Sequence, residues 1–173
     1  MTPDRHLLLT PVDKEAPARV RRLRGLGIGD RPDPALDLFA DRLAELTGAP
    51  YAMVNFIDEH RQFFAGLHSP DNVLSRYLAR DHGYCPHVVV RRKALVLEDV
   101  CDYPRFAGNP VVDEIGIRSY LGAPLIDRTE IVLGTVCVVD VQPRRWGRAG
   151  LDTIKTLAAE LVEQIHRRED GGI

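Results

Sequence analysis

One continuous stretch, from Ile117 to Asp140, constrains the fold of this chain more than any other. It consists of two arms rich in β-branched and apolar residues, separated by the polar segment Asp-Arg-Thr-Glu at 127–130. Each arm has the length of a strand, and a short polar connection between two such arms favours an antiparallel hairpin. The second arm does not alternate between apolar and polar residues, so we expect a central strand covered on both faces.

Two glycines and a proline interrupt these arms at positions that a strand tolerates. Gly122 and Gly134 lack a Cβ, which allows another backbone or a ligand to come close. Pro124 lies near the end of the first arm, where a missing N–H is acceptable. The interruptions are therefore compatible with the hairpin.

The residues before this hairpin predict a helix and a second hairpin. Asp33 and Pro34 form a favourable helix start, and apolar residues then recur at helical spacing as far as Gly48, a C-terminal stop. Residues 51–57 and 62–67 resemble strands and are joined by a polar turn, which predicts an antiparallel pair.

The middle of the chain is less regular. Residues 68–83 form a polar segment that is long for a connection, as is typical of lids or disordered loops. We expect a short helix over 85–90, where proline suits the first turn, and a strand over 94–100. Prolines mark the next segment, 103–116, as a loop with short helical turns.

The C-terminal segment predicts a long helix over 148–168. Its apolar stripe mixes three- and four-residue steps, the spacing of a seam between helices, and consists of Leu151, Ile154, Leu157, Ala158, Leu161 and Ile165. Two interpretations follow. The first and last helices form a homodimer interface, or the stripe merely covers the sheet of its own chain.

Together these segments resemble a GAF domain. The resemblance rests on the run Gly-Ile-Arg-Ser-Tyr-Leu-Gly-Ala-Pro-Leu, followed by Leu-Gly-Thr-Val-Cys-Val-Val-Asp, and includes Tyr-Cys-Pro-His at 84–87, residues 100–110 and the hairpin at 53–66. It covers residues 34–168 and is to the bacterial subclass found alone or upstream of histidine kinases and cyclic-di-nucleotide enzymes. It implies an α/β fold in the α+β sense: a central, mainly antiparallel sheet of five or six strands, with the N- and C-terminal helices packed on one face.

Composition and charge exclude several classes of function. The net charge of −2 gives no reason to expect nucleic acid or an acidic membrane as a partner. No apolar run approaches the ~20 residues of a membrane span, and the N-terminus lacks a signal peptide, so we expect a cytoplasmic protein. The three cysteines, Cys85, Cys101 and Cys137, show no zinc-binding spacing, so neither a metal site nor a disulfide framework is expected.

Residues 1–33 are expected to form a leader before a single domain at 34–169 and a short tail at 170–173. The leader contains a basic amphipathic segment at 18–26 with arginines at 19, 21, 22 and 24 and apolar residues at 20, 23 and 26. One interpretation is a contact with nucleic acid or membrane. We favour the simpler interpretation, a solvated helix whose apolar residues dock on the body of the domain. One short basic segment is a weak indication of a surface that binds nucleic acid or membrane.

Cys85 is the side chain best suited to chemistry. If Pro86 opens a helix, the thiol lies at its N-terminal end, where free N–H groups and the helix dipole favour a thiolate. His87 does not face it on a helix, so no Cys–His catalytic pair is implied. Cys85 is therefore either a redox-sensing, ligand-attaching or nucleophilic thiol, or a small buried residue at a helix cap. Cys137, within an apolar arm, is predicted to be core, and Cys101, with acidic neighbours, to be a poor nucleophile.

The resemblance to GAF domains implies three activities that can be compared with these residues. Free methionine-R-sulfoxide reductases carry a cysteine in a His-Ile-Ala-Cys segment after an Asp-Val and Phe-Pro motif. Here Asp-Val at 99–100 and Tyr-Pro at 103–104 precede Arg-Phe-Ala-Gly-Asn, so the nucleophile position is empty. Bilin-binding GAF domains attach the chromophore to a cysteine followed directly by histidine, whereas Cys85 is followed by Pro86. The Asn-Lys-x-x-Phe signature of cyclic-nucleotide-binding GAF domains is not found.

What remains is a small-molecule pocket, which the resemblance places between the sheet and the segment from the long loop through 103–116. Its candidate lining residues combine aromatic walls with a few polar groups: Phe64, Tyr84, Cys85, His87, Asp99, Phe106, Arg118 and Tyr120. The alternative for the aromatic residues is core packing. For Asp99 and Arg118 the alternative is that they pair with each other or with the backbone. The sequence specifies neither the ligand nor a cofactor.

We therefore expect a sensory or regulatory module that binds a small molecule or reports redox state. It would pass a shift through its terminal helices to a second copy or to a signalling partner in trans, since no output domain follows Ile173. Two alternatives remain. One is a thiol-dependent reductase that uses Cys85, and the other is a structural dimerisation module with a filled core and no ligand.

Overall fold

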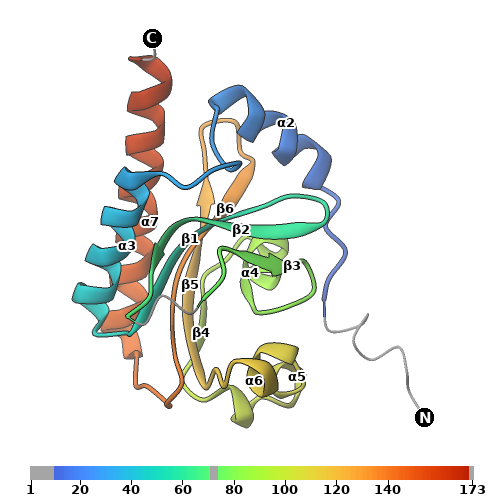
Figure 1. Ribbon diagram of the computed structural model, residues 1–173, viewed down its shortest axis with the longest axis vertical. Helices are drawn as coiled ribbons and strands as arrows, with labels where there is room; N and C mark the ends of the chain where they lie inside the picture. Colours follow the sequence, from blue (N-terminus) through green and yellow to red (C-terminus); the bar gives the residue numbers. More distant parts are fainter. Residues whose placement is uncertain (1–9, 71–73, 172–173) are drawn as a thin grey trace.

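The computed structural model describes residues 10–70 and 74–171, and their central element is a six-stranded sheet (Figure 1). The strand order is β3-β2-β1-β6-β5-β4, and every neighbouring pair is antiparallel. The strands are β1 (Tyr51–Ile57), β2 (Arg61–His68), β3 (Tyr77–Ala79), β4 (Leu95–Leu97), β5 (Ser119–Ile126) and β6 (Val132–Asp140). The predicted fold class, with six strands, is confirmed.

The hairpin predicted over 117–140 is confirmed as β5 and β6, paired from Ser119 opposite Asp140 to Ile126 opposite Val132. Every residue of β6 is buried, as expected for a central strand covered on both faces. A Cβ at position 134 would collide with the carbonyl oxygen of Asn55 on β1. The close approach that glycine permits there is therefore that of the neighbouring strand.

The helices are α2 (Ala16–Leu26), α3 (Pro34–Thr47), α4 (Cys85–Arg91), α5 (Pro104–Ala107), α6 (Pro110–Glu114) and α7 (Gly147–Asp170). Helix α3 begins as predicted, because the Asp33 side chain accepts a hydrogen bond from the Ala35 N–H at 2.9 Å. It ends at Gly48, which has a left-handed φ of 74°. None of the described helices combines the length and the apolar character needed to cross a lipid bilayer.

The two faces of the sheet are covered by different helices (Figure 1). The long helices α3 and α7 lie side by side on one face, where Leu43, Ile154 and Leu161 belong to a continuous buried cluster. The opposite side carries α4, α5 and α6 with a second cluster. Most of the α7 stripe is buried within its own chain, which agrees with the alternative that it covers the sheet, and a dimer interface stays a prediction.

Two segments in the middle of the chain differ from expectation. Residues 68–83, predicted as a loop, contain β3, which extends the sheet by pairing with β2 from Arg61–Ala79 to Phe63–Tyr77. The strand expected over 94–100 is shorter, since Val100–Asp102 forms a 3-10 turn after β4. Both differences arise from hydrogen bonds that apolar periodicity does not report. Residues 77–79 pair with β2, and the Asp99 carboxylate accepts from the Cys101 N–H at 3.1 Å.

Helix α2, which contains the basic segment, packs on the body of the protein. Leu23 is buried in the cluster beneath α3 and α7. The Arg19 side chain is fully buried, where it donates to the Asp13 carboxylate at 2.6 Å and to the carbonyl oxygen of Val132 on β6. Arg22 connects this helix to the β5–β6 turn and to α7, donating at 2.7 Å to each of Asp127 and Glu169. Two of the four arginines are thus held in internal ion pairs.

Candidate functional site

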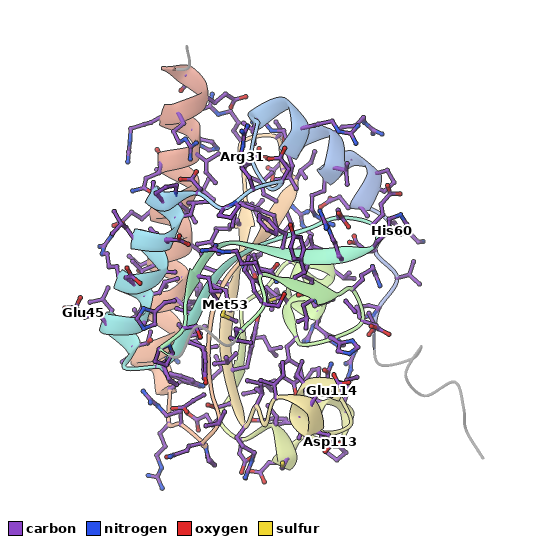
Figure 2. The ribbon with its side chains drawn as sticks, in the orientation of Figure 1. Arg31, Glu45, Met53, His60, Asp113 and Glu114 are labelled. Carbon is purple, nitrogen blue, oxygen red and sulfur yellow. The ribbon has the colours of Figure 1, made fainter. Side chains whose placement is uncertain are left out.

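A cavity of about 500 Å³ lies on the face of the sheet opposite α3 and α7. Its floor comes from β1, β2, β5 and β6, and its walls come from β3, the start of α4 and the end of α6. Met53 on β1 lies in the middle of the molecule, and Glu114 lies on α6 at the lower right (Figure 2). The apolar and aromatic lining residues are Tyr51, Met53, Phe64, Leu74, Tyr77, Leu78, Tyr84, Val111, Ile115, Ile117, Tyr120 and Val139.

Two hydrogen-bonded amide side chains, Gln62 and Asn55, lie at the cavity floor. Gln62 Nε2 donates to the carbonyl oxygens of Ala79 and His82, at 2.9 and 2.6 Å. Because carbonyl oxygens only accept hydrogen bonds, this contact fixes the Gln62 amide with its Oε1 toward Asn55. Asn55 must then present Nδ2, which donates to that oxygen at 2.8 Å. Its Oδ1 is left buried with no partner among the described residues.

The sulfur of Cys85 is surrounded by hydrogen-bonding groups at the same floor. Thr135 on β6 donates its hydroxyl to Cys85 Sγ at 3.0 Å, and the Tyr120 hydroxyl lies 3.1 Å from the same sulfur. Cys137 Sγ lies 3.6 Å away. All four side chains are buried, so the contacts are protected from water.

These contacts perturb the acidity of both thiols. Burial raises the pKa of Cys85, but hydrogen bonds from Cys137, Thr135, Tyr120 and Asn55 outweigh it and lower the pKa to about 7. The hydrogen bond to Cys85, together with burial, raises the pKa of Cys137 well above its ordinary value. Burial, followed by the two neighbouring sulfurs, likewise raises the pKa of Tyr120. The arrangement concentrates thiolate character on Cys85.

The eight predicted site residues divide into three groups: four line the cavity, two lie behind it, and two form an ion pair outside its described lining. Phe64, Tyr84, Cys85 and Tyr120 line the cavity together. Phe106 and His87 are buried one layer behind, outside the described lining: the Phe106 ring packs edge-to-face on Tyr84 and on His87, at centroid separations of 5.5 and 5.1 Å. The second pair therefore supports the cavity wall without forming it.

Asp99 and Arg118 form an ion pair with each other. Arg118 donates to the Asp99 carboxylate at 2.8 and 3.1 Å, and this contact lowers the pKa of Asp99. Neither residue is among the described lining residues of the cavity. The structure therefore shows the two side chains paired with each other, which was the alternative to a place in the cavity lining.

His87 carries the second of the two buried polar side-chain atoms that have no partner among the described residues. Its Nδ1 has no hydrogen bond among the described residues, and its side chain is almost completely buried. Burial, assisted by the nearby positive charges of Arg105 and Arg91, lowers the pKa of His87 to about 4. His87 is therefore neutral at physiological pH and acts as a packing residue behind Phe106.

Sequence reasoning missed three polar residues of the lining, Asn55, Gln62 and Cys137, and also Thr135, which lies outside the described lining and donates to Cys85. Cys137 is buried, as predicted for core, yet it also lines the cavity. A usable signal existed for Asn55, since a single amide between Val54 and Phe56 in an apolar strand must find a partner. Within the described residues, no group of three or more histidine, cysteine, aspartate or glutamate side chains is arranged to hold a metal ion.

Comparison with known proteins agrees with this architecture. The family model described as "GAF domain" matches residues 31–165, so the chain belongs to the GAF domain family. A curated relative, the cyclic di-GMP phosphodiesterase PA2567 of Pseudomonas aeruginosa, is 31% identical over 121 residues. That match covers 68% of this chain but only 20% of the relative, so this chain corresponds to a small part of that protein.

Solved structures with the same fold include an enzyme and a chromophore-binding domain. A free methionine-R-sulfoxide reductase from Neisseria meningitidis, in complex with its substrate, superposes with a TM-score of 0.66 at 16% identity, covering 93% of this chain and 96% of that one. The chromophore-binding domain of a bacteriophytochrome from R. palustris superposes with a TM-score of 0.62 at 13% identity, covering 93% and 65%. At these identities the likeness concerns the fold, which hosts both catalysis and sensing.

Proposed function

We propose that this GAF domain is a sensory module that binds a small, largely apolar ligand in the cavity. The observation that carries the proposal is a cavity of about 500 Å³ with a predominantly apolar and aromatic lining, a volume and a lining typical of small-molecule sites. The chromophore-binding relative is a precedent for a ligand in this fold.

The lining indicates the chemistry of the ligand. Among the described lining residues Glu114 is the one carboxylate, and none is arginine or lysine. A phosphate group would find no charge partner there, so the cavity favours an uncharged or weakly cationic molecule. The aromatic walls favour a flat ring. A neutral heteroaromatic compound meets both conditions.

The position of the cavity supports a route for its signal. Strands β1 and β6 form part of the cavity floor, and the opposite face of the same strands packs against α3 and α7. A ligand that shifts these strands therefore changes how α3 and α7 pack on the sheet. Leu38 and Leu46 on α3 are exposed apolar side chains, which supports an interface with a second copy or with a signalling partner in trans.

Thermal melts with a library of neutral heteroaromatic compounds test the ligand. A true ligand at one hundred times its dissociation constant adds about 2.7 kcal/mol to the stability of the folded protein. Val139→Phe, which places a ring in the cavity, should abolish binding. Val12→Ala, which truncates an exposed side chain outside the described lining, is the matched control and should bind normally. A library in which every binder ignores Val139→Phe would refute the site.

Native mass spectrometry of the same preparation tests the interface. We expect a homodimer, and the double variant Leu38→Glu/Leu46→Glu should be monomeric because it places charge on the apolar surface of α3. A monomeric parent protein, with or without ligand, would contradict the dimer and leave the cavity proposal intact.

A further inference from the structure

Two cysteines share the cavity floor, and ligand binding as proposed above uses neither as a reactive group. Cys85 is the first residue of α4, Cys137 lies in the middle of β6, and both line the cavity. Their Sγ atoms are 3.6 Å apart. We propose that they form a redox site, in which a small hydroperoxide oxidises Cys85 and Cys137 then closes a disulfide with it.

The surroundings of Cys85 are those of a nucleophilic sulfur. The Thr135 hydroxyl donates to its Sγ at 3.0 Å, and the Tyr120 hydroxyl lies at 3.1 Å. Hydrogen-bond donors directed at sulfur stabilise the thiolate relative to the thiol. The pKa of about 7 that results leaves a substantial thiolate fraction at neutral pH, and the thiolate is the form that attacks a peroxide.

Cys137 has the opposite character, which suits the second step. Its Sγ lies 3.6 Å from that of Cys85, and this contact, together with burial, raises the pKa of Cys137 well above its ordinary value. Cys137 is therefore the thiol that keeps its proton. A protonated thiol in contact with an oxidised sulfur is positioned to resolve it and can deliver the proton that the departing oxygen needs.

The cavity supplies both access and room to move. A disulfide requires the two sulfurs to approach to about 2.05 Å, so they must move closer by about 1.5 Å. Both residues belong to the cavity lining, but Cys137 is fully buried and only Cys85 has accessible surface, so the peroxide reaches Cys85 first and the Cys85 side chain moves toward Cys137. The third thiol, Cys101, is exposed on the 3-10 turn after β4 and is outside the described lining, so it serves as an internal reference.

The chemistry balances without a further cofactor. The Cys85 thiolate attacks one peroxide oxygen, an S–O bond forms and the O–O bond breaks, and the departing alkoxide takes a proton to become an alcohol. Cys137 then attacks the Cys85 sulfenic acid. The S–S bond forms, the S–O bond breaks, and hydroxide leaves as water with the Cys137 proton. Two thiols are oxidised to one disulfide, and one hydroperoxide is reduced to alcohol and water.

Peptide mapping of the unsubstituted protein provides the primary test, because it requires no variant to fold. After treatment with equimolar hydrogen peroxide at pH 7 under non-reducing conditions, we expect a peptide pair joined through Cys85 and Cys137, with the intact mass lower by two hydrogen atoms. Dithiothreitol should restore the original mass. A Cys101→Ser variant should behave identically, since Cys101 takes no part.

Three variants then separate the two roles. Cys137→Ala should stop at the Cys85 sulfenic acid, which gains one oxygen atom and reacts with dimedone. Cys85→Ala should leave Cys137 reduced over the same period. Tyr120→Phe keeps both thiols but removes one hydroxyl from the Cys85 sulfur, and it should slow oxidation about fivefold at pH 7 by reducing the thiolate fraction.

Three outcomes would overturn the proposal. The first is oxidation that reaches Cys101 while Cys85 and Cys137 stay reduced. The second is a Cys85→Ala variant in which Cys137 is oxidised at the original rate. The third is a disulfide that forms with free methionine sulfoxide but not with hydroperoxide, which would replace the peroxide-responsive site by a reductase. None of these results bears on the ligand proposal, whose readout is the binding of heteroaromatic compounds.

Discussion

The two faces of this sheet come from the same strands, yet the centre of one face is filled by apolar side chains and the other face holds a cavity. The filled face has openings of about 450 and 260 Å³ at its margins, along β5 and α7 and beside residues 27–36. On the face of α3 and α7, side chains such as Leu43, Val136 and Leu161 form a continuous buried cluster. On the opposite face, the space between the strands and α4 and α6 is left partly open, and that cavity is bordered by amides, hydroxyls and thiols.

The difference follows from the shape of the covering elements. Helices α3 and α7 contain 14 and 24 residues and present long apolar stripes, which can follow the sheet closely. Helices α4, α5 and α6 contain 7, 4 and 5 residues and are joined by loops. Such short helices cannot cover the face of the sheet without leaving gaps. A sheet covered in this way has one face that provides stability and one face on which a binding site can develop.

The largest expected difference in unfolding free energy between the two faces comes from changing one glycine on each face to alanine. On the helix side, a Cβ at Gly66 would collide with the backbone carbonyl of Leu36 at the start of α3, so Gly66→Ala should cost about 3 kcal/mol. On the cavity side, a Cβ at Gly122 would meet the Tyr120 side chain, which has open volume beside it. Gly122→Ala should cost about 1 kcal/mol. Urea unfolding measures both, and equal losses would contradict the comparison.

Truncating two adjacent valines on β6 gives a smaller difference of the same kind. Val138 is buried on the helix side, and Val139 lines the cavity. Val138→Ala should lose about 2–3 kcal/mol, because it creates a void among packed neighbours. Val139→Ala enlarges an existing cavity and should lose about 1 kcal/mol or less. The two free energies of unfolding, measured under the same conditions, check the ratio; a larger loss at Val139 would reverse it.

His87 should make the cavity-side layer sensitive to acid. Its pKa is about 4 in the folded state, against about 6.5 in the unfolded chain. As the pH falls from 6.5 to 4, the unfolded state takes up the proton first, so folding stability decreases, by about 2–3 kcal/mol from this group. His87→Leu should flatten the pH dependence by that amount. Denaturant midpoints for both proteins at pH 7 and pH 4.5 provide the measurement, and parallel curves would exclude a role for His87.

The smallest expected change in stability comes from Thr135→Val, which preserves shape but removes a donor to Cys85 Sγ. Stability should change by less than about 1 kcal/mol. The pH midpoint of Cys85 alkylation, about 7 in the parent protein, should rise by about one unit. Iodoacetamide labelling followed by peptide mass spectrometry reads the midpoint for Cys85 directly. An unchanged midpoint would remove Thr135 from the set of groups that control this thiol.

Much of the filled face could be predicted because its signals are local and repetitive. Asp33, Pro34 and Gly48 indicate where α3 begins and ends. The apolar stripe of α7 indicates which side of α7 is buried. The hollow face was predicted only in part. Phe64, Tyr84, Cys85 and Tyr120 do line the cavity, whereas Asp99 and Arg118 satisfy each other outside its described lining.

The amino-acid sequence by itself determined the class of fold, the central hairpin and the two covering helices, because apolar periodicity and capping act over a few residues. Tertiary structure alone decided that α4 brings Cys85 within 3.6 Å of Cys137, a residue 52 positions away, and that the Gln62 amide leaves Asn55 with an unpaired oxygen. The physical reason is that hydrogen bonds and thiol contacts across a cavity depend on distances between distant segments, which no local pattern encodes.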